Sequence, residues 1–187
     1  MNRYASKMKE LNATPIGFPT EQPIHLSEDD LQEAERQLGT RLPEDYREFV
    51  RDFGVFGVPT VIFPVRSNPD DIDVGSPESF KGIVRETRRI VWDIVSNYKS
   101  NCESYGDDPT WSTNWLVIAD AGGGSVVLSI KGEDKGAVYY YLNATGNYTA
   151  YLIADSFDEF MQLLESAHNE LEAKEHAERF WSTYKFT

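Results

Sequence analysis

The sequence contains few side chains suited to catalysis, and they do not group into a catalytic pattern. Asp120 stands directly before three consecutive glycines at the predicted end of a strand, where a carboxylate can serve as an acid or base. A lone carboxylate at such a position is more typical of a tight turn. The glycines lack the lysine and the helix start of a phosphate-binding loop, so they favour a hairpin. We therefore expect no catalytic residue and no enzyme activity.

Metal-ligating and nucleophilic side chains are equally sparse. His168 and His176 are eight residues apart, about two turns of one helix, which is too far for both to ligate one metal ion. Asp71 and Asp73 suggest a calcium loop, but the glycine and the closing glutamate of an EF-hand are missing. Cys102 has no local motif that would make it a thiol nucleophile. We expect neither a metal nor a cofactor.

Net charge is the most informative total in the composition. The 18 Lys and Arg residues against 31 Asp and Glu residues give a formal net charge of −13. Such a surface repels nucleic-acid phosphates and anionic lipids, so neither is expected as a direct partner, whereas a basic protein is attracted. Acidity also keeps a cytosolic protein soluble, and composition alone does not decide between these two interpretations.

The length of 187 residues suits one folded domain with short additions. A single cysteine is typical of a reducing compartment, and the sequence shows neither a signal-peptide core nor about 20 consecutive apolar residues, so we expect a cytoplasmic protein. An arm with little regular structure, which can still pack through Ile16 and Phe18, is expected to precede the domain. The predicted parts are the N-terminal arm (1–25), an α+β domain (26–165) and a C-terminal helical extension with an aromatic end (166–187).

The centre of the fold is expected in residues 115–154, where β-rich runs alternate with glycine-rich breaks. Val126 and Leu128 fall on one face of a strand and Val127 and Ser129 on the other, the period-two pattern of a half-buried strand. We predict a three-stranded antiparallel meander that a fourth run extends. The fold class is α+β, an antiparallel sheet of about four to six strands with helices packed against it.

Helices are expected on both sides of this block. Ser27 caps the first helix and Gly39 ends it, and a second helix begins at Pro43. A capping box at Ser156 opens a long final helix whose apolar stripe reaches Leu171. The remaining predicted elements are a proline-bounded edge strand over 58–65 and a helix over 79–98.

Two acidic, turn-rich loops are the candidate partner-binding sites. One follows the predicted edge strand, and the other, residues 100–114, combines acids with aromatic residues that are typical interface anchors. In an alternative interpretation, Trp111 simply covers the sheet edge. The aromatic C-terminus either folds back or contacts another chain, and the oligomeric state stays open. The candidate contact residues are Asp70, Asp71, Asp73, Glu103, Asp107, Asp108 and Trp111.

Five motifs in order resemble the SUKH superfamily, in the branch of the fungal cell-wall synthesis regulator. The resemblance runs from about Leu26 to Leu164 and implies the same α+β architecture. Ser125 and Ser129 stand where relatives frequently carry acidic residues. The motifs are the Leu38-Gly39 pair, the Leu42-Pro43 helix start with Tyr46 and Phe49, the Trp115 strand, the Asp120 glycine turn and Ser156-Phe157-x-x-Phe160.

In bacteria the resemblance implies an immunity protein that binds and neutralises a cognate toxin, often a nuclease, by stoichiometric protein–protein interaction. The alternative is a regulatory scaffold that binds an endogenous protein, as the fungal relative suggests. A third interpretation, an unrecognised enzyme, requires a pocket that brings Asp120 against a second titratable group. A basic toxin domain is the expected partner, because the chain is so acidic.

Overall fold

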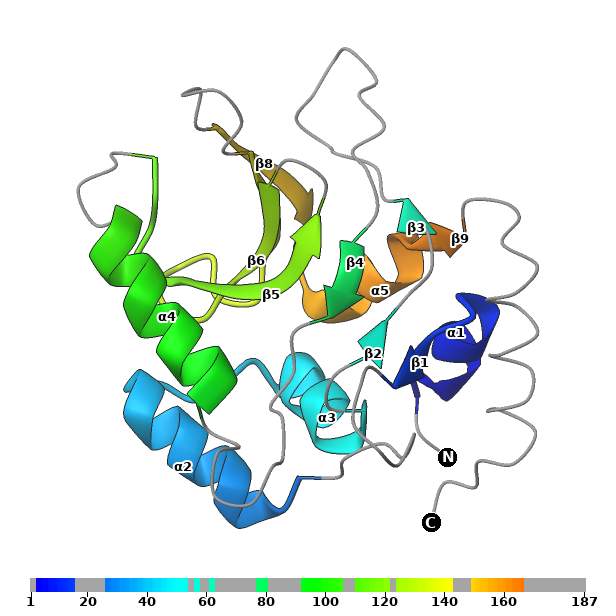
Figure 1. Cartoon of the computed structure of the whole chain (residues 1–187), viewed down its shortest axis with the longest axis horizontal. Coiled ribbons are helices and arrows are strands. Elements are labelled where there is room, and N and C mark those ends of the chain that lie inside the picture. The colour runs from blue at the N-terminus through cyan, green and yellow to red at the C-terminus, as the bar shows by residue number, and fades with distance from the viewer. Residues whose placement is uncertain are drawn as a thin grey trace.

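The structure in Figure 1 is a computed structural model in which a main antiparallel sheet lies among helices. The helices and the sheet come from both halves of the chain, so the fold is built from contacts that are distant in sequence. The residues that the structure describes are 3–15, 26–53, 56–57, 61–62, 77–80, 92–105, 110–121, 124–142 and 149–166.

The main sheet has seven antiparallel strands within these residues, in the order β1-β2-β4-β5-β6-β7-β8. Its four long strands are β5 (Trp115–Ala121), β6 (Gly124–Ser129), β7 (Val138–Leu142) and β8 (Thr149–Ala154). The short strands β4 (Pro77–Phe80), β2 (Phe56–Gly57) and β1 (Thr14–Pro15) extend the β5 edge. A separate pair joins β3 (Val61–Ile62) to β9 (Glu165–Ser166). The predicted meander is confirmed as β5 to β8.

The described residues contain five helices: α1 (Ala5–Glu10), α2 (Glu28–Leu38), α3 (Glu44–Phe53), α4 (Trp92–Tyr105) and α5 (Phe157–Leu163). The two helices predicted before the sheet are confirmed as α2 and α3. At the start of α2, the Ser27 hydroxyl accepts a hydrogen bond from the Asp30 N–H, and the Asp30 carboxylate accepts one from the Ser27 N–H. Gly39 ends α2 at φ 68°, a left-handed conformation that costs glycine little.

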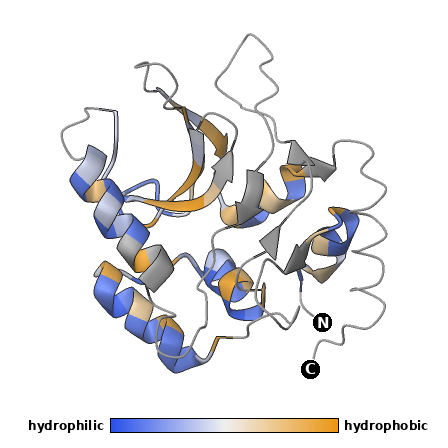
Figure 2. Ribbon diagram, in the orientation of Figure 1, coloured by the Kyte–Doolittle hydropathy of each residue, from blue (hydrophilic) through white to orange (hydrophobic). Residues whose placement is uncertain are grey.

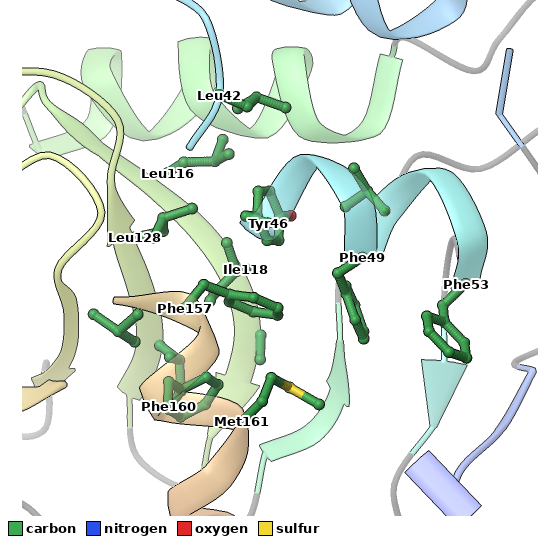
Figure 3. Close-up of a cluster of buried hydrophobic side chains, with 14 of the residues drawn as sticks. Leu42, Tyr46, Phe49, Phe53, Leu116, Ile118, Leu128, Phe157, Phe160 and Met161 are labelled. Carbon is green, nitrogen blue, oxygen red and sulfur yellow. The ribbon is translucent and has the colours of Figure 1, made fainter. Parts of the chain in front are cut away.

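The main hydrophobic core lies between the helices and one face of the meander (Figure 3). Phe157 of α5 is at its centre, with its ring centroid 5.0 Å from those of both Tyr46 and Phe49 on α3. Leu116 and Ile118 of β5 meet this layer from the sheet side (Figure 3). The long strands are accordingly hydrophobic, whereas α2 is mostly hydrophilic on its outside (Figure 2). Helices packed on an antiparallel sheet confirm the predicted α+β class.

The N-terminal segment is more regular than predicted. Residues 5–10 form α1, and Met8, Leu11 and Ala13 are completely buried in the main core. Tyr4 packs edge-on against Phe49. The expectation of little regular structure was wrong, because Tyr4, Met8 and Leu11 have the i, i+4, i+7 spacing of a short amphipathic helix. Residues 16–25 lie outside the described part of the chain.

Two predicted helices have different bounds in the structure. Residues 79–80 belong to strand β4, where Ser79 pairs with Asp120 of β5, so the helix predicted over 79–98 does not begin there. The described α4 runs from Trp92 to Tyr105 and therefore continues into the predicted loop. Residues 81–91 are not described.

The helix predicted to continue to Leu171 ends much earlier. Ser156 caps α5 by accepting a hydrogen bond from the Glu159 N–H, while the Glu159 carboxylate accepts one from the Asp155 N–H. The helix stops at Leu163, Leu164 is extended and fully buried, and β9 then pairs with β3. Pairing with a distant strand overrides the local apolar stripe. The predicted aromatic C-terminal extension lies beyond the described residues.

Candidate functional site

The face of the meander opposite the main core carries a second cluster rich in aromatic side chains, here called the aromatic face. It is distinct from the main core because tryptophan and tyrosine dominate it in place of leucine and phenylalanine. Its buried members are Trp111, Trp115, Val117, Val127 and Tyr141, and the half-buried side chains of Tyr105, Tyr139 and Ala150 pack against them.

Strand register brings these side chains onto one face. Val117 of β5 is paired with Val127 of β6, which is paired with Tyr139 of β7. Two residues further along β7, Tyr141 is paired with Ala150 of β8. Because side chains alternate along a strand, these members all point away from the main core.

Trp111 is the residue that joins the rings of the aromatic face. Its ring centroid lies 5.1 Å from Tyr105 at the end of α4, 5.1 Å from Tyr141 and 5.7 Å from Trp115. Such tilted and edge-on arrangements are the favoured geometries of aromatic pairs. Trp111 is 8% exposed, and its indole N–H is the one buried side-chain donor of the described residues without a hydrogen-bond acceptor.

The aromatic face overturns one prediction. The alternation around Val127 and Ser129 predicted a half-buried strand, but both residues are 0% exposed. β6 is therefore buried on both faces in this region. The signal was present in the sequence, because Tyr139 and Tyr141 alternate with the core residues Val138 and Tyr140.

A polar network borders the aromatic face at the turn between β6 and β7. Asp134 holds this network: one of its carboxylate oxygens accepts from the Ser129 hydroxyl at 3.0 Å and the other from the Tyr139 hydroxyl at 2.9 Å. Partial burial, the hydrogen bond to Asp134 and the negative charges of Asp134 and Asp155 raise the pKa of Tyr139 to about 12. Gly132 and Gly136 have φ values of 87° and 105°, which only glycine adopts easily, so they shape the turn.

Of the predicted partner-binding residues, Glu103 and Trp111 lie in the described part of the chain and the others lie outside it. Glu103 is exposed and lies on the last turn of α4, so its predicted position in a loop was wrong. Trp111 packs on the face of the sheet, and Tyr105, two residues after Glu103, lies against its ring. The structure thus places Tyr105 in the contact between α4 and Trp111, with Glu103 exposed on the same turn of the helix. The residues outside the described part are Asp70, Asp71, Asp73, Asp107 and Asp108.

Other acids, which were not predicted to bind a partner, lie on helices α2 and α3 over the main core. Arg47 of α3 is 5% exposed and is held between Glu28 and Glu35 of α2, with 3.1 Å between its Nε and the Glu35 carboxylate. The hydrogen bond from Arg47 lowers the pKa of Glu28. These two acids therefore fasten α2 to α3. Asp29 and Glu44 are exposed at the first turns of the two helices.

Metal sites and membrane spans are both absent from the residues that the structure describes. No group of three His, Cys, Asp or Glu side chains there can hold a metal ion. Asp120 is paired with Ser125 and Ser79 in the sheet, but the position of its side chain is not described. No helix in the described ranges is long and apolar enough to cross a membrane. What the described surface offers is the half-buried rings of Tyr105 and Tyr139 near the exposed acids Glu103 and Asp134, groups that suit protein recognition.

Sequence comparison agrees with the fold. The model of the SMI1 / KNR4 family (SUKH-1) matches residues 25–163, which include α2, α3, the whole meander and α5. No curated protein matches the chain. The match covers well over half of the 187 residues. The chain therefore belongs to the SMI1 / KNR4 family (SUKH-1).

Proposed function

We propose that this protein is an immunity protein that neutralises a cognate toxin by binding it in a stoichiometric complex. Membership of the SMI1 / KNR4 family is consistent with immunity or regulatory roles, both of which rest on protein–protein interaction. The observation that carries the proposal is this family membership in a chain with a net charge of −13. We propose that the protein acts in the cytoplasm by occluding the toxin, without catalysis, metal or cofactor.

The proposed partner is a basic toxin domain, such as a nuclease. A nucleic-acid-cleaving protein needs positive charge at its active site to hold phosphates, and an acidic inhibitor is attracted to that charge. The association should be fast at low salt and slow markedly as salt rises, because mobile ions screen charges over about 10 Å at 0.1 M.

The proposed contact residues are the acids of the two sequence-predicted segments together with Trp111. Glu103 is exposed and available to a partner. Trp111 is nearly buried, so its expected role is to support the surface from below. Asp70, Asp71, Asp73, Asp107 and Asp108 complete the proposed set on the strength of the sequence.

The test is to co-purify the tagged protein with the product of the adjacent upstream gene and to titrate the complex against salt. An equimolar complex with a basic, toxic protein that loses its toxicity on binding would support immunity. Glu103→Lys should weaken that complex, whereas Glu10→Lys on α1 serves as a charge-matched control at another exposed site. Recovery of endogenous proteins without any toxin would favour the regulatory scaffold.

A further inference from the structure

One end of the aromatic face combines an accessible ring with exposed carboxylates. Tyr139, at the second position of β7, is half-buried, and its ring centroid lies 5.4 Å from that of Trp115. Its hydroxyl donates to the carboxylate of Asp134, which is exposed. The ring is therefore held from behind by Trp115 and at its edge by Asp134.

A second carboxylate lies close to this ring. Val138, the first residue of β7, is paired with Ala154, the last residue of β8, so Asp155 follows directly beside the start of β7. Asp155 is exposed, and its negative charge acts on Tyr139. Asp134 and Asp155, which come from different turns, therefore both lie next to the start of β7, where Tyr139 is the second residue.

The basic residues of the same turn are engaged elsewhere. Lys131 donates to the Tyr98 hydroxyl of α4 at 3.1 Å, and Lys135 donates to the main-chain carbonyl of Arg41 at 2.6 Å. No ion pair to Asp134 occurs among the residues whose positions are described. Asp134 is exposed, so its negative charge can act on a cation that approaches from solvent.

We propose that Tyr139, Asp134 and Asp155 form the docking position for an arginine or lysine side chain presented by a protein partner. A cation gains from the face of an aromatic ring and from a carboxylate at its edge, and a guanidinium group suits both at once because it is flat and carries several donors. The proposal rests on the proposed function, since it names the chemistry by which a basic partner would be recognised. Trp115 and Trp111 form the rigid support behind this position.

The first test uses hexa-arginine as a probe, with binding followed by NMR and tryptophan fluorescence at 0.1 M salt. In the unaltered protein, the signals of Tyr139 and of the Trp115 indole should shift. Asp134→Asn combined with Asp155→Asn should weaken binding by about fivefold to tenfold, the combined size of two exposed ion pairs.

The matched control removes two negative charges from other exposed sites, by Glu10→Gln on α1 and Asp29→Asn on α2. It should change the affinity by less than about twofold, because it alters only the long-range field. Equal losses in the two double variants would overturn the proposal, since the peptide would then be held by diffuse charge alone.

A thermal unfolding scan and one further variant separate folding from recognition. Asparagine at position 134 can still accept from Tyr139, and a thermal unfolding scan of the double variant reports whether the turn is intact. If it is not, Tyr139→Leu tests the ring alone and should reduce the preference for hexa-arginine over hexalysine, because only guanidinium stacks well on an aromatic face. An unchanged preference would contradict the role of the ring.

Failure of this docking position is distinguishable from failure of the proposed function. If the unaltered protein neutralises a toxin and both double variants do so equally well, immunity stands and the docking position is wrong. If no toxin is neutralised but hexa-arginine still distinguishes the variants, the docking position stands and another basic protein is the partner.

Discussion

The two faces of the β5–β8 meander bury their side chains in different ways. The first face meets α2, α3 and α5 mainly through aliphatic and phenylalanine side chains, with a few tyrosines such as Tyr46 and Tyr140 among them. The second face is covered by tryptophan and tyrosine rings, and it leads to the half-buried Tyr139 and the exposed Asp134. The first face is closed off by the helices, whereas the proposed docking position lies at the edge of the second.

The largest expected effect is on the first face. Phe157→Ala should lower the free energy of unfolding by about 3 to 5 kcal/mol, because it leaves a cavity between α3, α5 and the sheet. Urea unfolding followed by circular dichroism measures this loss. Phe157→Leu keeps most of the volume and should cost less than about 1.5 kcal/mol. Similar costs for both variants would contradict the close packing of this ring.

The helix layer over the first face depends on a buried cation. Arg47→Ala should cost about 2 to 4 kcal/mol, because Glu35 loses its charged partner in a half-buried site and α2 loses its ion pairs to α3. Denaturant unfolding gives the value. Arg41→Ala removes an exposed partner of Glu44 and should cost less than about 1 kcal/mol. Equal losses of unfolding free energy for the two substitutions would contradict an added contribution from the burial of Arg47.

On the second face, two substitutions of Trp111 separate the contribution of its ring packing from that of its indole N–H. Trp111→Phe should cost only about 1 kcal/mol, because its indole N–H has no acceptor to lose and an aromatic ring remains between Tyr105 and Tyr141. Trp111→Ala should cost about 3 kcal/mol or more. Unfolding curves of both variants provide the comparison. A phenylalanine variant as unstable as the alanine variant would show that the indole shape is essential.

The smallest expected effect concerns pH and the edge of the second face. The pKa of Tyr139 is raised to about 12 in the folded state from its ordinary value of 10.0, so the folded protein keeps this proton more tightly. The resulting stability is complete below pH 10 and is lost as pH rises towards 12. Because the ring is partly exposed, the contribution should stay below about 1 kcal/mol. Tyr139→Phe should therefore lose less stability over this interval than the unaltered protein, as urea titrations at several pH values would show.

The predictions that succeeded relied on local patterns. Ser27 and Gly39 mark the ends of α2 because capping and a left-handed conformation depend on a few neighbouring residues. The meander followed from period-two alternation and from the glycines of its turns. The candidate site was predicted less well: Glu103 lies on a helix, and Asp134 and Tyr139 did not stand out because their meeting depends on how a turn folds.

By itself, the sequence determined the α+β class, the caps of α2, the four-stranded meander and the acidic charge, because each depends on neighbouring residues or on composition. Only the tertiary structure decided that Tyr4 and Met8 enter the core, that the last helix stops at Leu163 and that aromatic rings bury the second face. These outcomes depend on contacts between distant segments, such as β9 with β3 and Trp111 with Tyr141. The free energy gained by burying a face depends on the segment that covers it. The local sequence of a strand does not show which distant segment that is.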